Sequence, residues 1–162
     1  MTTLVQAPSV TARITPDSTI PGAPTTVAPT GPAAYTVIVL VNVAENHYDG
    51  YQVGHHVAEV TATEHDTTPL ALVFHAAPYT KVDAVADAAW VVGNRMGADD
   101  AGQTWPRDVR SVSKGDVLAV TAPDGTTVHL CVGSTRFSPA EPPMPHCMVP
   151  LAGTDASSRR RT

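Results

Sequence analysis

Histidine has the most potential for chemistry in this sequence, because seven histidines occur in a chain of 162 residues. His55-His56, His65-Asp66 and His75 are of the types that bind transition metals. A zinc site needs ligands that converge on one point, yet the sequence contains no H-x-x-x-H or C-x-x-C spacing. Adjacent histidines on a strand also point to opposite faces. The pattern favours scattered surface and half-buried histidines, so we expect no metal.

Cys131, Ser111 and Ser113 could act as nucleophiles. His129 lies two positions before Cys131, and such residues on a strand share a face. Nucleophilic catalysis also needs a third group that orients the base, and neither such a group nor a G-x-S-x-G elbow is evident. Asp116 is better explained as a turn aspartate that accepts hydrogen bonds from backbone amides than as a catalytic carboxylate. We therefore expect no catalytic residue, no enzyme activity and no cofactor.

The loop MGADDAGQTWPRDVR, residues 96–110, is the best candidate for a binding surface. It carries Trp105 among polar and basic residues, and exposed tryptophan and arginine side chains often anchor protein interfaces. The alternative is that Trp105 folds back as a lid over the core, whereas Trp90, at helical spacing, is expected inside the core. The candidate partner-binding residues are Trp105, Arg107, Arg110, Arg95 and Lys114.

Strands that must position these residues are predicted from short apolar runs. YTVIVLVNV, residues 35–43, is rich in β-branched residues, which indicates a strand that is covered on both faces and central in its sheet. Further strands are expected near 57–63 and 70–76, with a loop or bulge at Gly54. Pro123-Asp124-Gly125 interrupts the last apolar run, which predicts a β-hairpin of residues 117–122 with 126–132, entered through Gly115 and Asp116.

A helix is predicted after residue 80, because apolar residues recur there at helical spacing. Thr80 is expected to cap it, with Asp83 completing a capping box. Gly93 and Asn94 suit the left-handed conformation that ends helices, so the helix should stop there. The expected fold class is α+β, with a small mixed or antiparallel sheet and one main helix packed on it.

The two ends of the chain differ from its middle, because most of the 15 prolines lie near the termini. Proline-rich segments are typical of disordered tails. We expect a disordered Thr/Pro-rich tail over residues 1–33, a single α+β domain over 34–138, and a disordered Pro-rich tail with a basic C-terminus over 139–162. Two cysteines, no signal peptide and no apolar run of about 20 residues predict a cytoplasmic protein without a membrane partner.

The region from the helix end GNRM through TWP and RSVSKGDVLAV to CVGSTRF resembles uncharacterised proteins of actinobacteria and of their plasmids and phages. Their shared phrase is approximately N-R-S-L-S-V-G-D-V-V, followed by a hairpin and a Gly-aromatic end, and a related phrase occurs in YodL-like domains. The resemblance spans roughly Asp83 to Phe137, with Val112 and Lys114 in place of the usual Leu and Val. It implies the fold and a mobile-element origin, and it implies no particular activity.

The sequence as a whole favours a non-enzymatic binding module for an unidentified protein partner, which would contact residues 96–110 and the hairpin edge. The alternative is a nucleic-acid-binding module, since phrases of the S-x-G-D-x-V type also lead into strands of small RNA-binding β-barrels. A net charge of −5 disfavours this alternative, although the basic residues gather in the later part of the chain.

Overall fold

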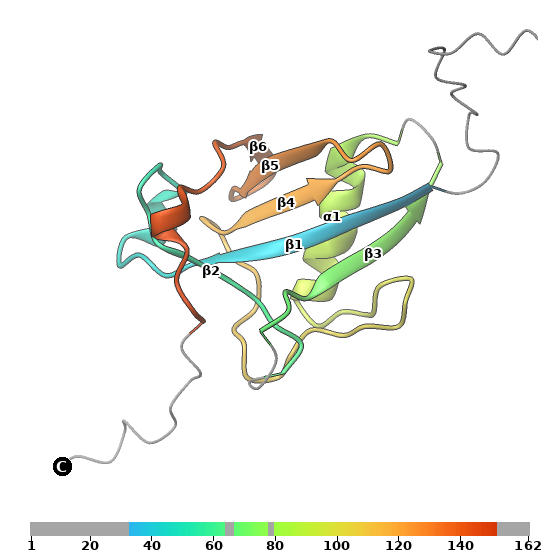
Figure 1. Ribbon diagram of the computed structural model, residues 1–162, viewed down its shortest axis with the longest axis horizontal. Coiled ribbons are helices and arrows are strands. Elements are labelled where there is room, and N and C mark those ends of the chain that lie inside the picture. Colours follow the sequence, from blue (N-terminus) through green and yellow to red (C-terminus); the bar gives the residue numbers. More distant parts are fainter. Residues whose placement is uncertain (1–32, 64–66, 78–79, 152–162) are drawn as a thin grey trace, which may run out of the picture.

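The computed structural model describes residues 33–63, 67–77 and 80–151 of the chain. These residues form a six-stranded antiparallel sheet with the helix α1 packed on one face, as Figure 1 shows. The expected α+β class, with an antiparallel sheet, is confirmed. Residues 1–32 of the predicted N-terminal tail and residues 152–162 of the predicted C-terminal tail lie outside the described residues. The strands are β1 (Ala33–Asn42), β2 (Val57–Glu59), β3 (Ala71–Ala76), β4 (Val117–Thr121), β5 (Thr127–Val132) and β6 (Phe137–Pro139); α1 is Val82–Gly93, and the 3-10 helices η1 and η2 are His47–Asp49 and Pro145–Cys147.

β1 is the central strand, as its apolar run predicts. It pairs with β4 along one edge, and with both β3 and β2, one after the other, along the opposite edge. β5 and β6 continue the sheet beyond β4. The second half of β1, from residue 39, is buried at every position. The first half instead alternates between buried side chains and side chains that are at least partly exposed. Coverage of both faces therefore holds for the second half alone.

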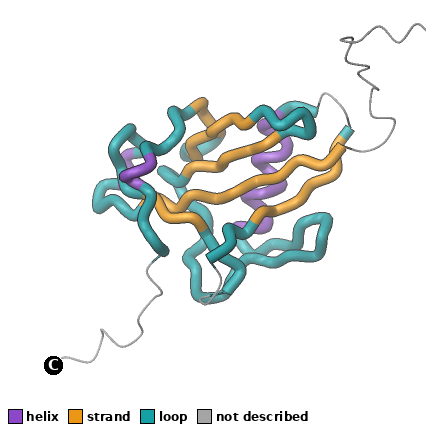
Figure 2. Tube along the Cα trace, in the orientation of Figure 1, coloured by secondary structure: helices purple, strands orange, loops and turns teal. Residues whose placement is uncertain are grey.

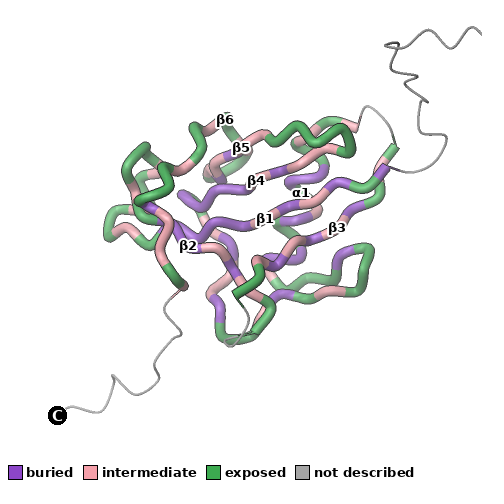
Figure 3. Tube along the Cα trace, in the orientation of Figure 1, coloured by how far each residue is buried: buried purple, intermediate pink, exposed green. Residues whose placement is uncertain are grey.

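The main core lies between the sheet and α1. The helix contributes Val85, Ala86, Ala89 and Val92, which recur at helical spacing and are all buried. These small side chains let the helix approach the sheet closely, so the core is thin and depends on the packing of valines and leucines. Figure 3 shows the buried segments of α1 lying against the buried middle of the sheet. The sheet residues that they meet include Tyr35, Val37, Val39, Leu72, Phe74, Leu118 and Val120.

The other face of the sheet carries a second, smaller apolar cluster, made by Leu40, Val57 and Val117. The chain after residue 139 covers it: Met148 packs on the cluster, and Cys147 is only 2% exposed. The amide of Val149 donates to the Val57 carbonyl at 2.9 Å. Figure 2 shows this segment and the η1 loop together at one end of the sheet. The boundary expected at residue 138 is therefore wrong, because apolar side chains between the prolines anchor residues 139–151 to the domain.

The predicted N-cap of α1 is wrong, whereas its predicted end is confirmed, since the helix stops at Gly93 with Asn94 as the C-cap. Thr80 donates its hydroxyl to the Ala77 carbonyl at 2.7 Å, and Lys81 is the N-cap, without a side-chain cap. At the other end the left-handed residue is Arg95, with φ 59°, rather than Gly93 or Asn94. The amide of Met96 donates to the Val91 carbonyl at 3.0 Å, which is the bond that defines a Schellman motif. Glycine normally occupies that position, so Arg95 must be held there by other contacts.

The predicted hairpin of β4 and β5 is confirmed, with Thr121 opposite Thr127. Gly125 has φ 86°, a conformation that glycine adopts without strain, and the Asp124 carboxylate accepts a hydrogen bond from the Thr126 amide at 2.8 Å. β2 is shorter than the predicted 57–63. The reason is that pairing with β1 ends at Val60, whose carbonyl accepts a hydrogen bond from the Leu70 amide at 2.7 Å.

Candidate functional site

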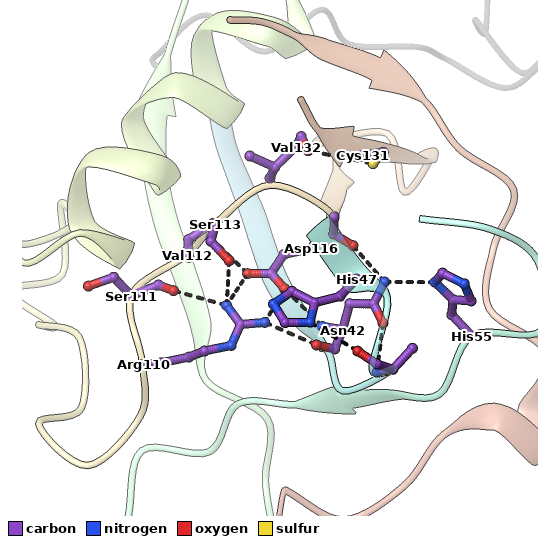
Figure 4. A network of polar contacts seen from close by, with 12 residues as sticks. Asn42, His47, His55, Arg110, Ser111, Val112, Ser113, Asp116, Cys131 and Val132 are labelled. Carbon is purple, nitrogen blue, oxygen red and sulfur yellow. Dashed lines mark hydrogen bonds and ion pairs between the residues drawn. The ribbon is translucent and has the colours of Figure 1, made fainter. Parts of the chain in front are cut away.

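The RSVSKGD segment, residues 110–116, is fixed to the domain by the buried carboxylate of Asp116. This residue is 0% exposed. Its oxygens accept hydrogen bonds from the Ser113 amide at 2.8 Å and the Asn42 amide at 2.9 Å. They also accept hydrogen bonds from both terminal nitrogens of Arg110, at 2.6 and 2.8 Å (Figure 4). The expectation that Asp116 binds backbone amides is confirmed, and the ion pair with Arg110 adds to it.

Asn42, at the end of β1, extends this network across the fold. Its side-chain amide donates to the Gly115 carbonyl at 3.0 Å and contacts His55 Nδ1 at the same distance. Gly115 has φ 91°, and a Cβ at this position would lie 1.9 Å from the His47 carbonyl oxygen. Only glycine therefore allows the segment to pass this closely to η1. The hydrogen bond from Asn42 and the close approach to η1 therefore fix the positions of Lys114 and Asp116, the neighbours of Gly115 in the chain.

Arg95 and Arg110, two of the predicted partner-binding residues, are engaged within the domain. The Arg95 guanidinium donates to the Ser111 hydroxyl at 2.8 Å and to the backbone carbonyls of Pro106, Arg107 and Val109. Arg110 donates to the Ser113 hydroxyl and the Asn42 carbonyl as well as to Asp116. Arg95 therefore joins the loop to the RSVSKGD segment, and Arg110 joins that segment to the end of β1. The many contacts of Arg95 also explain how it tolerates its left-handed backbone.

The two tryptophans have the opposite of their expected environments. Trp105 is 3% exposed, and its indole N–H donates to the Arg110 carbonyl at 2.9 Å. The expectation that Trp105 is an exposed anchor is wrong, and the alternative, that it folds back over the core, is right. Trp90 is 37% exposed, so its expected place in the core is wrong. The buried face of α1 is filled by alanine and valine, which leaves the larger Trp90 at the margin of the core.

The first part of the predicted binding loop covers the outer edge of β3. The Asp99 carboxylate accepts a hydrogen bond from the Val73 amide at 2.7 Å, and the Asp100 carboxylate accepts one from the His75 amide at 2.6 Å. The Gln103 side chain donates to the Ala71 carbonyl at 2.8 Å. Unpaired edge groups invite pairing with another strand, and these side chains satisfy them. This part of the loop therefore has a structural role at the sheet edge.

The carboxyl group of Asp99 is buried at this edge, with 6% of the residue exposed. Burial by itself raises its pKa, but hydrogen bonds from the Val73 and Gln103 amides, the Gln103 side chain and the Ala101 amide outweigh it. The pKa of Asp99 is consequently below the ordinary carboxyl value. Asp99 thus stays ionised and acts as an acceptor for this loop.

A cleft of about 410 Å³ lies beside the RSVSKGD segment. One wall is the outer face of α1 with Asp87 and Trp90, and the floor is formed by the segment 112–114. The other wall is the turn between β5 and β6, residues 132–137. Gly93 makes this arrangement possible, since a Cβ there would lie 2.3 Å from a Val112 methyl group. Gly93 therefore allows α1 and Val112, both parts of the cleft, to pack tightly against each other.

The cleft combines aromatic, apolar and cationic side chains. Trp90 is exposed and Phe137 is half-buried, while Lys114 and Arg136 are exposed at its margins. Neither cation makes an ion pair with another described residue, and the same holds for Asp87. Lys114 is thus the predicted binding residue that lines the cleft; Arg107 is exposed but outside its lining. The sequence did not single out Trp90, Arg136 or Phe137 as binding residues. Arg136 and Phe137 belong to the phrase CVGSTRF, which carries part of the resemblance described above.

The side chains considered for catalysis do not assemble into a nucleophilic site in the described part of the chain. The hydroxyls of Ser111 and Ser113 accept hydrogen bonds from Arg95 and Arg110. The Cys131 thiol lies 3.7 Å from the Val132 carbonyl, and burial lowers the pKa of His129. Among the same residues, no three His, Cys, Asp or Glu side chains gather as a metal site requires. His65, one of the candidate ligands, lies outside the described residues.

Comparisons with known proteins assign no function to this site. No protein-family model, no curated protein and no solved structure matches this chain. The resemblance to actinobacterial, plasmid and phage proteins therefore stays a prediction. Within residues 33–63, 67–77 and 80–151, no helix has the length and apolar character that crossing a bilayer demands.

Proposed function

We propose that this protein is a non-enzymatic binding module that holds a protein partner in the cleft between α1 and the β5–β6 turn. The observation that carries the proposal is the exposure of Trp90 beside two cations, Lys114 and Arg136, in one concave site. Tryptophan and arginine are enriched among the residues that dominate interface energetics. An indole left 37% exposed at a hollow in the surface is apolar area that a partner can bury.

The proposal retains the expected type of function and moves the binding surface. Trp105, Arg95 and Arg110 hold the loop and the RSVSKGD segment in place, so they support the cleft from behind. Lys114 is presented by that segment. A rigid support of this kind lowers the entropy lost when a partner binds.

Nucleic acid is the second candidate ligand, because an exposed tryptophan next to lysine and arginine also suits a stacked base and its phosphate. Two features weigh against it. Asp87 lies in the same lining, where it would repel a phosphate, and the net charge of the chain is −5.

Selection from a random peptide display library tests the proposal. We expect enriched peptides that bind the wild-type protein and lose about tenfold or more in affinity for Trp90→Ala. Tyr48→Ala is the matched control, since Tyr48 is an aromatic residue that is 64% exposed and does not line the cleft. Equal binding to both variants would move the site elsewhere. Salt-dependent binding of single-stranded oligonucleotides, in the absence of peptide binding, would favour the second candidate.

The expected origin in a phage or plasmid and the expected cytoplasmic location remain part of the proposal. They are supported by the RSVSKGDVLAV phrase and by the two cysteines, neither of which is in a disulfide. Identification of the genes beside this one tests the origin directly.

A further inference from the structure

We infer that the partner segment bound by this cleft is a short acidic peptide that carries an apolar or aromatic anchor, an inference that rests on the proposed function. The cleft has the volume of a small-ligand site, about 410 Å³, so it holds a few side chains of a partner and not a folded surface. The chemistry of its lining then decides which side chains these are.

The cationic side of the cleft selects carboxylates. Lys114 on the RSVSKGD segment and Arg136 on the β5–β6 turn come from different elements and line the same hollow. Neither has an ion pair with a described residue, and two positive charges that line one hollow favour the binding of an anion there. Arg136 can bind a carboxylate through two parallel hydrogen bonds, and Lys114 adds a point charge.

The contrast with the other arginines shows that these two cations are available. Arg110 is bound to Asp116 through both terminal nitrogens, and Arg95 donates to three backbone carbonyls and a hydroxyl. Lys114 and Arg136 have no such bond to a described residue. The domain thus uses some arginines to build its loops and leaves this pair of cations facing a cleft.

The apolar side of the cleft selects the anchor. Trp90 on α1 and Phe137 at the start of β6 both line the hollow, together with Val112 and Val132. An aliphatic or aromatic side chain inserted here would bury the exposed part of the indole, which provides the main favourable contribution to binding. The carboxylates flanking this anchor in the partner would then reach Lys114 and Arg136.

Asp87 distinguishes a peptide from a polyanion. Asp87 lines the cleft from α1, and its carboxylate has no ion pair within the described residues. It can accept a hydrogen bond from a peptide N–H, a group that a peptide has and a phosphate backbone lacks. A dense row of phosphates would meet repulsion here. The arrangement therefore favours an acidic peptide over nucleic acid.

Binding of three pools of synthetic peptides, measured by fluorescence anisotropy, tests the inference. All pools share a Leu-Phe centre, and their flanks are drawn from Asp and Glu, from Ser and Gln, or from Lys and Arg. We expect the acidic pool to bind most tightly. Its affinity should fall about tenfold for the double variant Lys114→Gln/Arg136→Gln and decrease as salt is added. The matched control, Lys81→Gln/Arg107→Gln, removes two exposed cations outside the cleft and should bind like the wild type.

The outcomes separate this inference from the proposed function. If display peptides bind in a Trp90-dependent way but the neutral or basic pool binds best, the acidic specificity is wrong and the binding module stands. Equal affinity of the acidic pool for both double variants leads to the same conclusion. If no pool binds and no Trp90-dependent peptide is found, both are wrong. Binding of polyuridylate or of vesicles with anionic lipid, in place of the acidic pool, also overturns the inference.

Discussion

The guanidinium of Arg110 and the carboxylate of Asp116 form a two-pronged ion pair, with Nη2–Oδ1 at 2.6 Å and Nη1–Oδ2 at 2.8 Å. The side chain of Asp116 is 0% exposed, while that of Arg110 is 36% exposed. The pair closes the segment between the two residues into a loop of fixed shape. The shape of the floor of the cleft therefore depends on a carboxylate that lies outside the cleft lining.

Replacement of Asp116 is predicted to destabilise the domain strongly. Asp116→Ala leaves the Arg110 charge and the amides of Ser113 and Asn42 without their acceptor, so we expect a loss of about 3 kcal/mol or more in the free energy of unfolding. Urea denaturation measures it. Asp87→Ala, at an exposed aspartate of α1 without an ion pair to a described residue, is the control and should cost about 1 kcal/mol or less. A similar cost for both variants would mean that the ion pair contributes little.

Two glycines with similar backbone angles are predicted to respond differently to alanine. Gly115 and Gly125 have φ of 91° and 86°, but only at Gly115 does an added Cβ meet an atom, the His47 carbonyl oxygen. Gly125→Ala should cost about 1 kcal/mol from backbone strain alone. Gly115→Ala should cost a further 1–3 kcal/mol or so, because η1 has to move. Equal midpoints in thermal melts of the two variants would contradict the close approach of the segment to η1.

The two tryptophans are predicted to separate stability from binding. Trp105→Ala removes a buried indole and its hydrogen bond, so it should lower the free energy of unfolding by about 3–5 kcal/mol. Trp90→Ala should have a much smaller effect on stability. Acrylamide quenching of single-tryptophan variants, made with phenylalanine at the other position, checks the exposure independently. Quenching of Trp105 as strong as that of Trp90 would show that the indole is accessible.

Acidification is predicted to weaken the cover on the edge of β3. Because the pKa of Asp99 is lower in the folded protein than in the unfolded chain, its contribution to stability is fully present above the ordinary value of 3.8 and is lost as pH falls through the folded pKa. Asp99→Asn has no such carboxyl, so the stability difference between wild type and variant should shrink below about pH 4. Melting temperatures across the acid range measure this. A difference that stays constant with pH would exclude Asp99 as the titrating group.

Sequence patterns were sufficient for the elements whose signals are local. The run from residue 35 to 43, the helical spacing after residue 80 and the Pro-Asp-Gly turn each depend on neighbours within a few positions. Their strands and helix appear in the structure close to where they were predicted. Lys114 was placed on the candidate surface for its charge alone. The cleft itself was not predictable, because its walls come from residues 87–90 and 132–137, far apart in the chain.

The sequence by itself determined the α+β class, the central position of β1, the hairpin of β4 and β5, and the role of Asp116 as an acceptor for backbone amides. Tertiary structure alone decided which tryptophan is buried, which arginines are engaged, and that residues 139–151 pack on the domain. The physical reason is that strands and turns follow from short-range periodicity and backbone conformation. Burial of a single large side chain depends instead on which distant segments meet it. Trp105 is buried and donates its indole N–H to the Arg110 carbonyl, whereas the face of α1 that contacts the sheet consists of smaller side chains and does not include Trp90.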